Sequence, residues 1–257
     1  MDNPSLTTPI LSSIWDGLSP HLIARFWPVE RVGSSREWQR VKDSPTVQAV
    51  LIDSNLEMTL GWQSPFENAG ADKGMPTLSA MLQSGAIQPF VDSKSSTGKF
   101  LESFEGRTGI TKLNSTQVFS GMPPIRIQVS ALFRAWRNAA SEVEAPVNQL
   151  VNWALPQELA SDGPILTLLA GIKTVAQGKP LDEAAAKSVL PSLAPAKIAM
   201  KYKGRIYSPL VIESIGLPLS SPVDANGKFV ELVVPMTLCS LTAIDRRDWG
   251  KTTGFTA

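Results

Sequence analysis

Few side chains in this sequence are of types that do chemistry, and their spacing does not group them. His21 is the only histidine, and nothing local supplies the carboxylate or nucleophile that a catalytic histidine needs. A surface or capping role is therefore favoured for it. Cys239 is the only cysteine and lies in an apolar segment, which is typical of an inert buried thiol. Zinc-type sites need three or four Cys or His ligands, so the count of these residues excludes them.

Other patterns echo catalytic motifs without the context that such motifs need. Gly250-Lys251-Thr252 resembles the end of a phosphate-binding loop, yet Asp245 stands where the earlier glycine is required. Ser96-Thr97-Gly98-Lys99 has Ser-x-x-Lys spacing, but in a loop and not on a helix. Two acidic pairs are interpreted as solvated charges: Glu142 with Glu144, and Asp245 with Asp248. The sequence predicts a protein that is not an enzyme and that uses no cofactor or metal ion.

Composition indicates a globular chain with little charge. The 257 residues are 43% hydrophobic and 18% charged, and the formal net charge is +1, which gives no reason to expect a nucleic-acid partner. A single cysteine allows no intrachain disulfide. The N-terminus lacks the features of a signal peptide, and no apolar run reaches the roughly 18 residues of a membrane span. We expect a soluble protein made in a reducing cytoplasm, without membrane contact.

The elements that would position these side chains are organised around one stretch, residues 118–156. Strict alternation of apolar residues predicts a long strand with one buried face: Ile125, Ile127, Val129, Ala131, Phe133 and Ala135. A helical stripe follows, made of Val143, Val147, Leu150, Val151 and Ala154, and Pro156 ends it. Phe133 and Leu150 are predicted to be buried.

The rest of the chain indicates short strands and loops. Residues 46–53 and 57–63 are predicted to form a hairpin that turns at Asp53-Ser54-Asn55. A second hairpin turns at Asn226-Gly227 and leads into an apolar strand, which Pro235 places at an edge or a bulge.

The predicted fold class is α+β, a mainly antiparallel β platform with packed helices and a small inserted helical segment. The expected organisation is an extended N-terminal arm at 1–45, a β-rich platform with packed helix at 46–159, an inserted helical segment at 160–196, a β-hairpin unit completing the platform at 197–245, and a flexible tail at 246–257.

The N-terminal arm contains three tryptophans, Trp15, Trp27 and Trp38, among prolines and charges. Such an arm either packs on its own core or docks on a neighbouring chain, and the sequence leaves both options open. Trp and Arg are enriched where protein interfaces are strongest. The interface candidates are therefore these three tryptophans together with Arg126, Arg134 and Trp136.

Two stretches resemble a known family. Pro123-Pro124-Ile125-Arg126-Ile127 leads into the long strand and the helix that ends at Trp153-Ala154-Leu155-Pro156. Later come Tyr202-Lys203-Gly204-Arg205, Val211 to Ile215, and Asp224-Ala225-Asn226-Gly227-Lys228. This order resembles the baseplate and tail-tube-associated proteins of contractile-tailed bacteriophages and related contractile injection systems. In those, a strand–Gly–strand–turn–strand unit follows a helix that packs on a β platform.

The likeness covers residues 118–156 and 198–245, about a third of the chain. The chain departs from the family in two ways, because no added small repeat follows Ile244 and because the inserted helices at 160–196 are not part of the pattern. The likeness therefore supports the class better than a particular place in the baseplate.

The resemblance implies a structural role in the virion. We expect a tail protein, assembled in the host cytoplasm, that forms a ring with itself, six-fold symmetry being one option. Its other expected partners are tail tube, hub and wedge baseplate proteins. A carbohydrate- or small-molecule-binding module that uses a Trp-rich surface is the alternative, since tryptophans form stacking platforms. A hydrolase acting through carboxylates is a third and weaker option.

Overall fold

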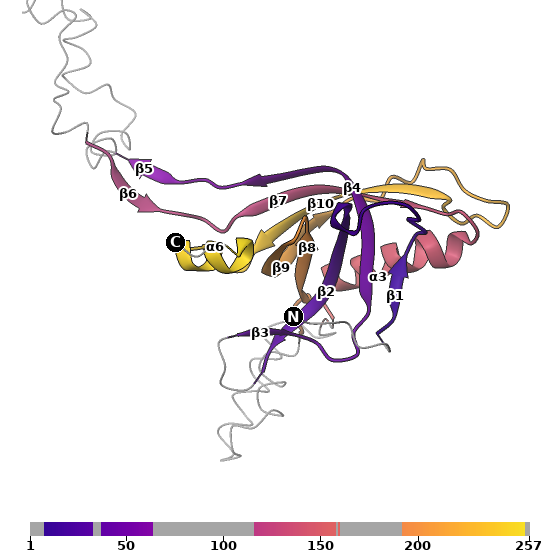
Figure 1. Ribbon diagram of the computed structural model, residues 1–257, viewed down its shortest axis with the longest axis horizontal. Coiled ribbons are helices and arrows are strands. Elements are labelled where there is room, and N and C mark those ends of the chain that lie inside the picture. Colours follow the sequence, from indigo (N-terminus) through magenta and orange to yellow (C-terminus); the bar gives the residue numbers. More distant parts are fainter. Residues whose placement is uncertain (1–7, 33–36, 64–115, 158, 160–191, 255–257) are drawn as a thin grey trace, which may run out of the picture. The chain divides into compact units, whose positions relative to one another are not determined.

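The computed structural model describes residues 8–32, 37–63, 116–157, 159 and 192–254 (Figure 1). It divides into two units, residues 1–58 with 123–257 and residues 59–122, and each is described by itself. Most of the predicted inserted helical segment, residues 160–191, and the Ser96-Thr97-Gly98-Lys99 match lie outside the described residues.

Strands predominate in the first unit. They are β1 (Ile10–Ser12), β2 (Ile23–Arg31), β3 (Trp38–Arg40), β4 (Thr46–Glu57), β7 (Arg126–Arg134), β8 (Lys197–Tyr202), β9 (Arg205–Ile215) and β10 (Glu231–Ser240). The helices among its described residues are α3 (Ala145–Ala154) and α6 (Arg246–Thr253), with a 3₁₀ turn at Pro20–Leu22 and a π-helical turn at Ala140–Glu144. The second unit contains β5 (Gly61–Gln63) and β6 (Val118–Gly121).

The large sheet of the first unit closes on itself. Its eight strands follow the order β1-β4-β7-β10-β9-β8-β2-β3, and β2 also pairs with β4, where Ile23 to Phe26 lie opposite Val50 to Val47. Six strands, β4-β7-β10-β9-β8-β2, therefore form a closed barrel in which all pairings are antiparallel. The short edge strands β1 and β3 are added outside this ring, and β1 pairs with β4 in parallel.

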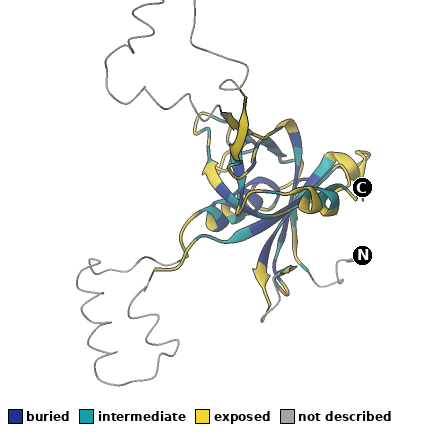
Figure 2. Ribbon diagram, turned by 90° about the vertical axis from the view of Figure 1, so that its left-hand side faces the viewer, coloured by how far each residue is buried: buried dark blue, intermediate teal, exposed yellow. Residues whose placement is uncertain are grey.

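The core residues lie on the strands of the barrel, whose ribbons are coloured largely as buried or intermediate in Figure 2. The predicted alternation is confirmed for Ile125, just before β7, and for Ile127, Val129, Ala131 and Phe133 within it, which are all buried. Ala135, predicted on the same face, lies past the end of β7 and is only half-buried. β10 contributes Leu232, Val234, Met236 and Leu238 in register with them, so that Phe133 lies opposite Leu232 and Ile127 opposite Leu238. A period of two is therefore enough to assign the inner face of both strands.

Helix α3 covers part of the barrel through one apolar face. Pro146 lies in its first turn, and Pro146, Val147, Leu150 and Trp153 are buried. The Ala196 N–H donates to the Trp153 carbonyl oxygen (3.1 Å), which holds the end of α3 beside the start of β8. Leu150 and Phe133 have no exposed surface, as the sequence predicts. The fold is mostly β with two short described helices, and since α6 has no buried residue, the expected packing of several helices is not supported.

The expectation of an extended N-terminal arm is wrong for its described residues. β2 is a barrel strand between β4 and β8, and it buries Ala24, Phe26 and Val29. Pro28 obscures the pattern in the sequence, because proline is unusual inside a sheet. On one side of β2, the first half of the strand pairs with β4 up to Phe26 and the second half pairs with β3 from Val29. Pro28 lies between these two pairings.

Three other expectations need correction. No turn occurs at Asp53–Asn55, because β4 continues to Glu57 along β7 with only a register shift between Leu51 and Asp53. Of the two options for the strand that carries Pro235, the edge is wrong, since β10 lies between β7 and β9. An irregularity does occur nearby, because the register of β10 on β9 shifts between Thr237 and Leu238. The predicted tail contains α6. Its first turn is closed by a capping box between Asp245 and Asp248, which supplies hydrogen bonds that a short helix otherwise lacks.

Candidate subunit interface

The second unit presents an apolar two-stranded ribbon. The rings of Trp62 on β5 and Phe119 on β6 meet edge to face, with centroids 5.4 Å apart and planes at 60°. Both side chains are about half exposed, as are Leu60 and Val118. A two-stranded hairpin alone is marginally stable in water, and clustered exposed aromatic residues mark interaction sites. We call Leu60, Trp62, Val118 and Phe119 the apolar ribbon.

Close backbone approach shapes this ribbon. A Cβ on Gly61 would lie 2.8 Å from Ser120 Oγ and 2.9 Å from the Gly121 carbonyl oxygen, so any larger residue forces the strands apart. The Ser120 hydroxyl donates to the Gly61 carbonyl oxygen at 3.1 Å. Glycine therefore allows the strands to approach closely, and the aromatic pair forms beside this contact.

In the first unit, the two candidate arginines form ion pairs at opposite ends of β7. Arg126 Nη2 lies 2.8 Å from Glu213 Oε1, and Arg134 pairs with Glu231 on the neighbouring strand. All four side chains are more than a third exposed, so each pair contributes little to stability. Both arginines are already engaged within the chain.

Trp136 remains the most exposed interface candidate, at 62%. The Arg134 guanidinium lies 6.0 Å from the centre of its ring. Its backbone is fixed by Glu142, whose carboxylate accepts the N–H groups of Trp136 (2.7 Å), Asn138 (2.9 Å) and Arg137 (3.1 Å). Glu142 is buried, which corrects its interpretation as a solvated charge.

The three tryptophans of the N-terminal segment are only partly exposed. Trp27 lies on β2 opposite Ala199 of β8. Trp38 on β3 lies under Arg31, whose guanidinium carbon is 4.9 Å from the ring centre. Trp15 precedes the 3₁₀ turn. The six interface candidates are therefore distributed over several strands, and the structure does not bring them together into one patch.

Neither the apolar ribbon nor a cationic hairpin turn between β8 and β9 is predicted from the sequence. Leu60 and Trp62 alternate with polar or small residues, which predicts a strand but not which face is left uncovered. The run Lys201-Tyr202-Lys203-Gly204-Arg205 mixes cations with an aromatic residue, and this was the available signal for a binding turn. Two cavities flank that turn.

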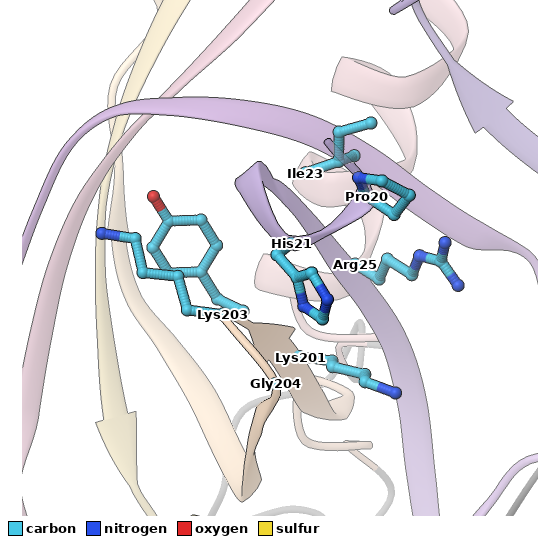
Figure 3. Close-up of a pocket in the computed structure, with 8 residues that line it drawn as sticks. Pro20, His21, Ile23, Arg25, Lys201, Lys203 and Gly204 are labelled. Atoms are coloured by element: carbon cyan, nitrogen blue, oxygen red, sulfur yellow. The ribbon is translucent and has the colours of Figure 1, made fainter. Parts of the chain in front are cut away.

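The remaining candidate chemistry stays isolated. His21 lines the smaller cavity and lies among cationic side chains, with no carboxylate in the lining (Figure 3). Burial, together with the Glu213 carboxylate, raises the pKa of the Cys239 thiol, which makes it a poor nucleophile at neutral pH. Within the described ranges, no group of three His, Cys, Asp or Glu could hold a metal ion. Nor does any described helix combine the length and apolar character needed to cross a membrane.

The chain was compared with protein families and with curated proteins. No model of a protein family matches the chain, and no curated protein matches it.

Proposed function

We propose that the chain is a non-enzymatic structural component of a contractile phage tail, located at the baseplate or at the tube–baseplate junction. It would join tube, hub or wedge proteins, and copies of itself in a ring, through subunit interfaces in the virion. The observation that carries the structural role is the apolar ribbon, Leu60, Trp62, Val118 and Phe119, each about half exposed. These side chains gain most by packing on another protein surface.

The order of elements supports the tail class. Helix α3 is followed by β8, a turn at Gly204, β9, a second turn and β10, which is the sequence of elements that the resemblance describes. In the second turn, Asp224 Oδ1 accepts the N–H groups of Asn226 (2.8 Å) and Lys228 (2.9 Å), and Gly227 has a φ of 74°. The residues Asp224 to Lys228, on which the resemblance partly rests, therefore form a hydrogen-bonded turn.

A Trp-rich binding platform has less support. Trp15, Trp27 and Trp38 are only partly exposed, and Trp136 stands apart from them on the segment that follows β7. A stacking platform needs adjacent exposed rings. The structure therefore favours assembly over carbohydrate binding as the use of the chain's tryptophans.

The proposal is tested by incorporation into tails. The full chain is co-expressed with the tube, hub and wedge proteins of the same tail, and particles are isolated and analysed by mass measurement and electron microscopy. The variant carrying Trp62→Ser and Phe119→Ser should leave the barrel of the first unit folded, because both residues belong to the second unit, but it should fail to enter the particles. Ile52→Ser is the matched control, since Ile52 is equally exposed on β4. Normal incorporation of the ribbon variant, or a chain that stays monomeric beside its proposed partners, would contradict the proposal.

A further inference from the structure

A tight hairpin turn between β8 and β9 separates two cavities of the first unit. Tyr202 and Arg205 are paired, and the two residues between them, Lys203 (φ 48°) and Gly204 (φ 79°), both have positive φ, as a two-residue hairpin of this kind requires. The Lys203 N–H donates to the His21 carbonyl oxygen (3.2 Å), which ties the turn to the segment before β2. Lys203 and Tyr202 line both cavities.

The charged side chains that line these two cavities are all positive. Figure 3 shows His21 among Arg25, Lys201 and Lys203 at the smaller cavity, of about 100 Å³. Arg205 lines the larger one, and neither lining contains a carboxylate. Because the formal net charge of the chain is only +1, four clustered cations do not follow from a general excess of basic residues.

Two of these cations lie opposite each other on neighbouring strands. Arg25 on β2 and Lys201 on β8 are direct cross-strand partners, an arrangement in which like charges repel. The ion pairs found among the described residues join Arg126 to Glu213 and Arg134 to Glu231, and they leave the turn uncompensated. An anion bound at the turn would relieve this repulsion.

The larger cavity, of about 310 Å³, is lined by residues of β4, β7, β8 and β9 where these strands meet at one end of the barrel, which we call the open end. Its size falls at the lower end of the range of about 300–1,000 Å³ that is usual for small-molecule sites. The buried residues Ile127 and Met200 belong to its lining, together with Tyr202 and Tyr207, the only two tyrosines of the chain. Lys203 Nζ lies 5.1 Å from the centre of the Tyr202 ring. Apolar surface, aromatic rings and cations therefore meet at one opening.

We propose that the open end of the barrel binds an organic phosphate. Its flat apolar part lies against Tyr202, Tyr207 and Met200, and its phosphate is held by Lys203 and Arg205. Guanidinium and ammonium groups form charge-assisted hydrogen bonds to phosphate, and aromatic rings stack on flat groups. Arg25 and Lys201 extend the positive charge into the smaller cavity, where a second phosphate finds a place. A nucleotide has this chemistry, either free or within a single strand. This inference does not depend on the proposed role in tails, which rests on the apolar ribbon.

The test is calorimetric titration of the full chain with three probes: phenyl phosphate, inorganic phosphate and phenol. Phenyl phosphate should bind with a saturable signal and more tightly than either of the others, because it alone carries both halves of the ligand. Arg205→Gln should weaken phenyl phosphate binding about ten-fold or more, the usual effect of losing a charge-assisted hydrogen bond. Lys228→Gln is the matched control, because this exposed residue belongs to neither lining and its loss should leave affinity unchanged.

A second variant separates the aromatic contribution from the charge. Tyr207→Leu should weaken phenyl phosphate several-fold while leaving inorganic phosphate unaffected, and circular dichroism checks that the variant is folded. Titrations with adenosine monophosphate and with a short oligothymidylate then distinguish the two sources of ligand, since a strand binds with a steep salt dependence. No saturable binding of phenyl phosphate, equal affinity for phenyl and inorganic phosphate, or full binding by Arg205→Gln would overturn the proposal. The proposal would also be overturned if Arg205→Gln reduced self-association of the chain while leaving ligand binding intact.

Discussion

At the residue scale, Glu142 shows how one buried carboxylate fixes a corner of the chain. Its three backbone donors close the turn after β7, and Ser13 Oγ donates to the Glu142 carbonyl oxygen while accepting from the Arg134 N–H, both at 2.9 Å. Burial by itself raises the pKa of Glu142, but the N–H groups of Trp136, Asn138 and Arg137 outweigh it and hold the pKa below its usual value. The ionised form is therefore part of the folded state.

We predict that Glu142→Gln lowers the free energy of unfolding by about 2–3 kcal/mol at pH 7, because charge-assisted hydrogen bonds are lost and an amide NH₂ faces N–H donors. Since the folded-state pKa is lowered, this stabilisation is complete above the usual carboxyl pKa of 4.5 and disappears as the pH falls through the folded value. Urea unfolding at pH 7 and pH 3 measures this, with exposed Glu30→Gln as the control. An equal difference from wild type at both pH values would refute the assignment.

A second residue-scale prediction concerns the packing of β7 and α3. Phe133 and Leu150 are fully buried, so truncation of either to alanine should cost about 2–5 kcal/mol through lost burial and a new cavity. Leu155→Ala, at an exposed position just past α3, should change stability by less than about 0.5 kcal/mol. If both core variants unfold at the same urea concentration as wild type, the packing of Phe133 and Leu150 in the core is contradicted.

At the element scale, α6 depends on its cap rather than on burial. None of its residues is buried, and Asp245 accepts the Asp248 N–H at 2.8 Å while Asp248 accepts the Asp245 N–H at 3.3 Å. The hydrogen bond from the Asp248 backbone lowers the pKa of Asp245, so the ionised carboxylate is the capping form. A helix of eight residues without this cap would be marginal.

We predict that Asp245→Ala speeds amide exchange at Trp249, whose N–H donates to the Asp245 carbonyl oxygen (3.0 Å). Asp245→Asn should preserve slow exchange, because asparagine caps nearly as well. In wild type the protection should weaken as the pH falls below the usual aspartate pKa, since the capping carboxylate becomes protonated. Exchange at Trp249 that is identical in wild type and both variants would mean that α6 is held by something other than its cap.

At the scale of the whole molecule, the barrel and the ribbon should respond differently to assembly. The amides of β2 are hydrogen-bonded in the barrel, so they should exchange slowly in purified protein and in intact tails alike. Residues 118–121 of β6 should gain protection only in the tails, because the ribbon is exposed in the free chain. Hydrogen exchange with mass spectrometry compares the two states. Equal protection of the ribbon in both states would count against the assembly role.

Local patterns in the sequence determined several parts of this protein. The alternation in β7 assigned its buried face, the apolar stripe and Pro156 located α3, and Asn226 with Gly227 located the last turn. Each of these signals is a periodicity or a backbone preference within a dozen residues. Such signals are visible without knowing which strands become neighbours.

Only the tertiary structure decided how the strands close and what the closure exposes. β2 is hidden in the sequence by Pro28, and it becomes a barrel strand because β4 and β8 supply partners from distant parts of the chain. Glu142 is indistinguishable from a surface acid until the turn folds three N–H groups around it. The positive turn around Lys203 joins residues from β2, β8 and β9, which no sequence window contains together. Pairing between distant strands depends on the total burial achieved by the fold, and this is a property of the whole chain rather than of any segment.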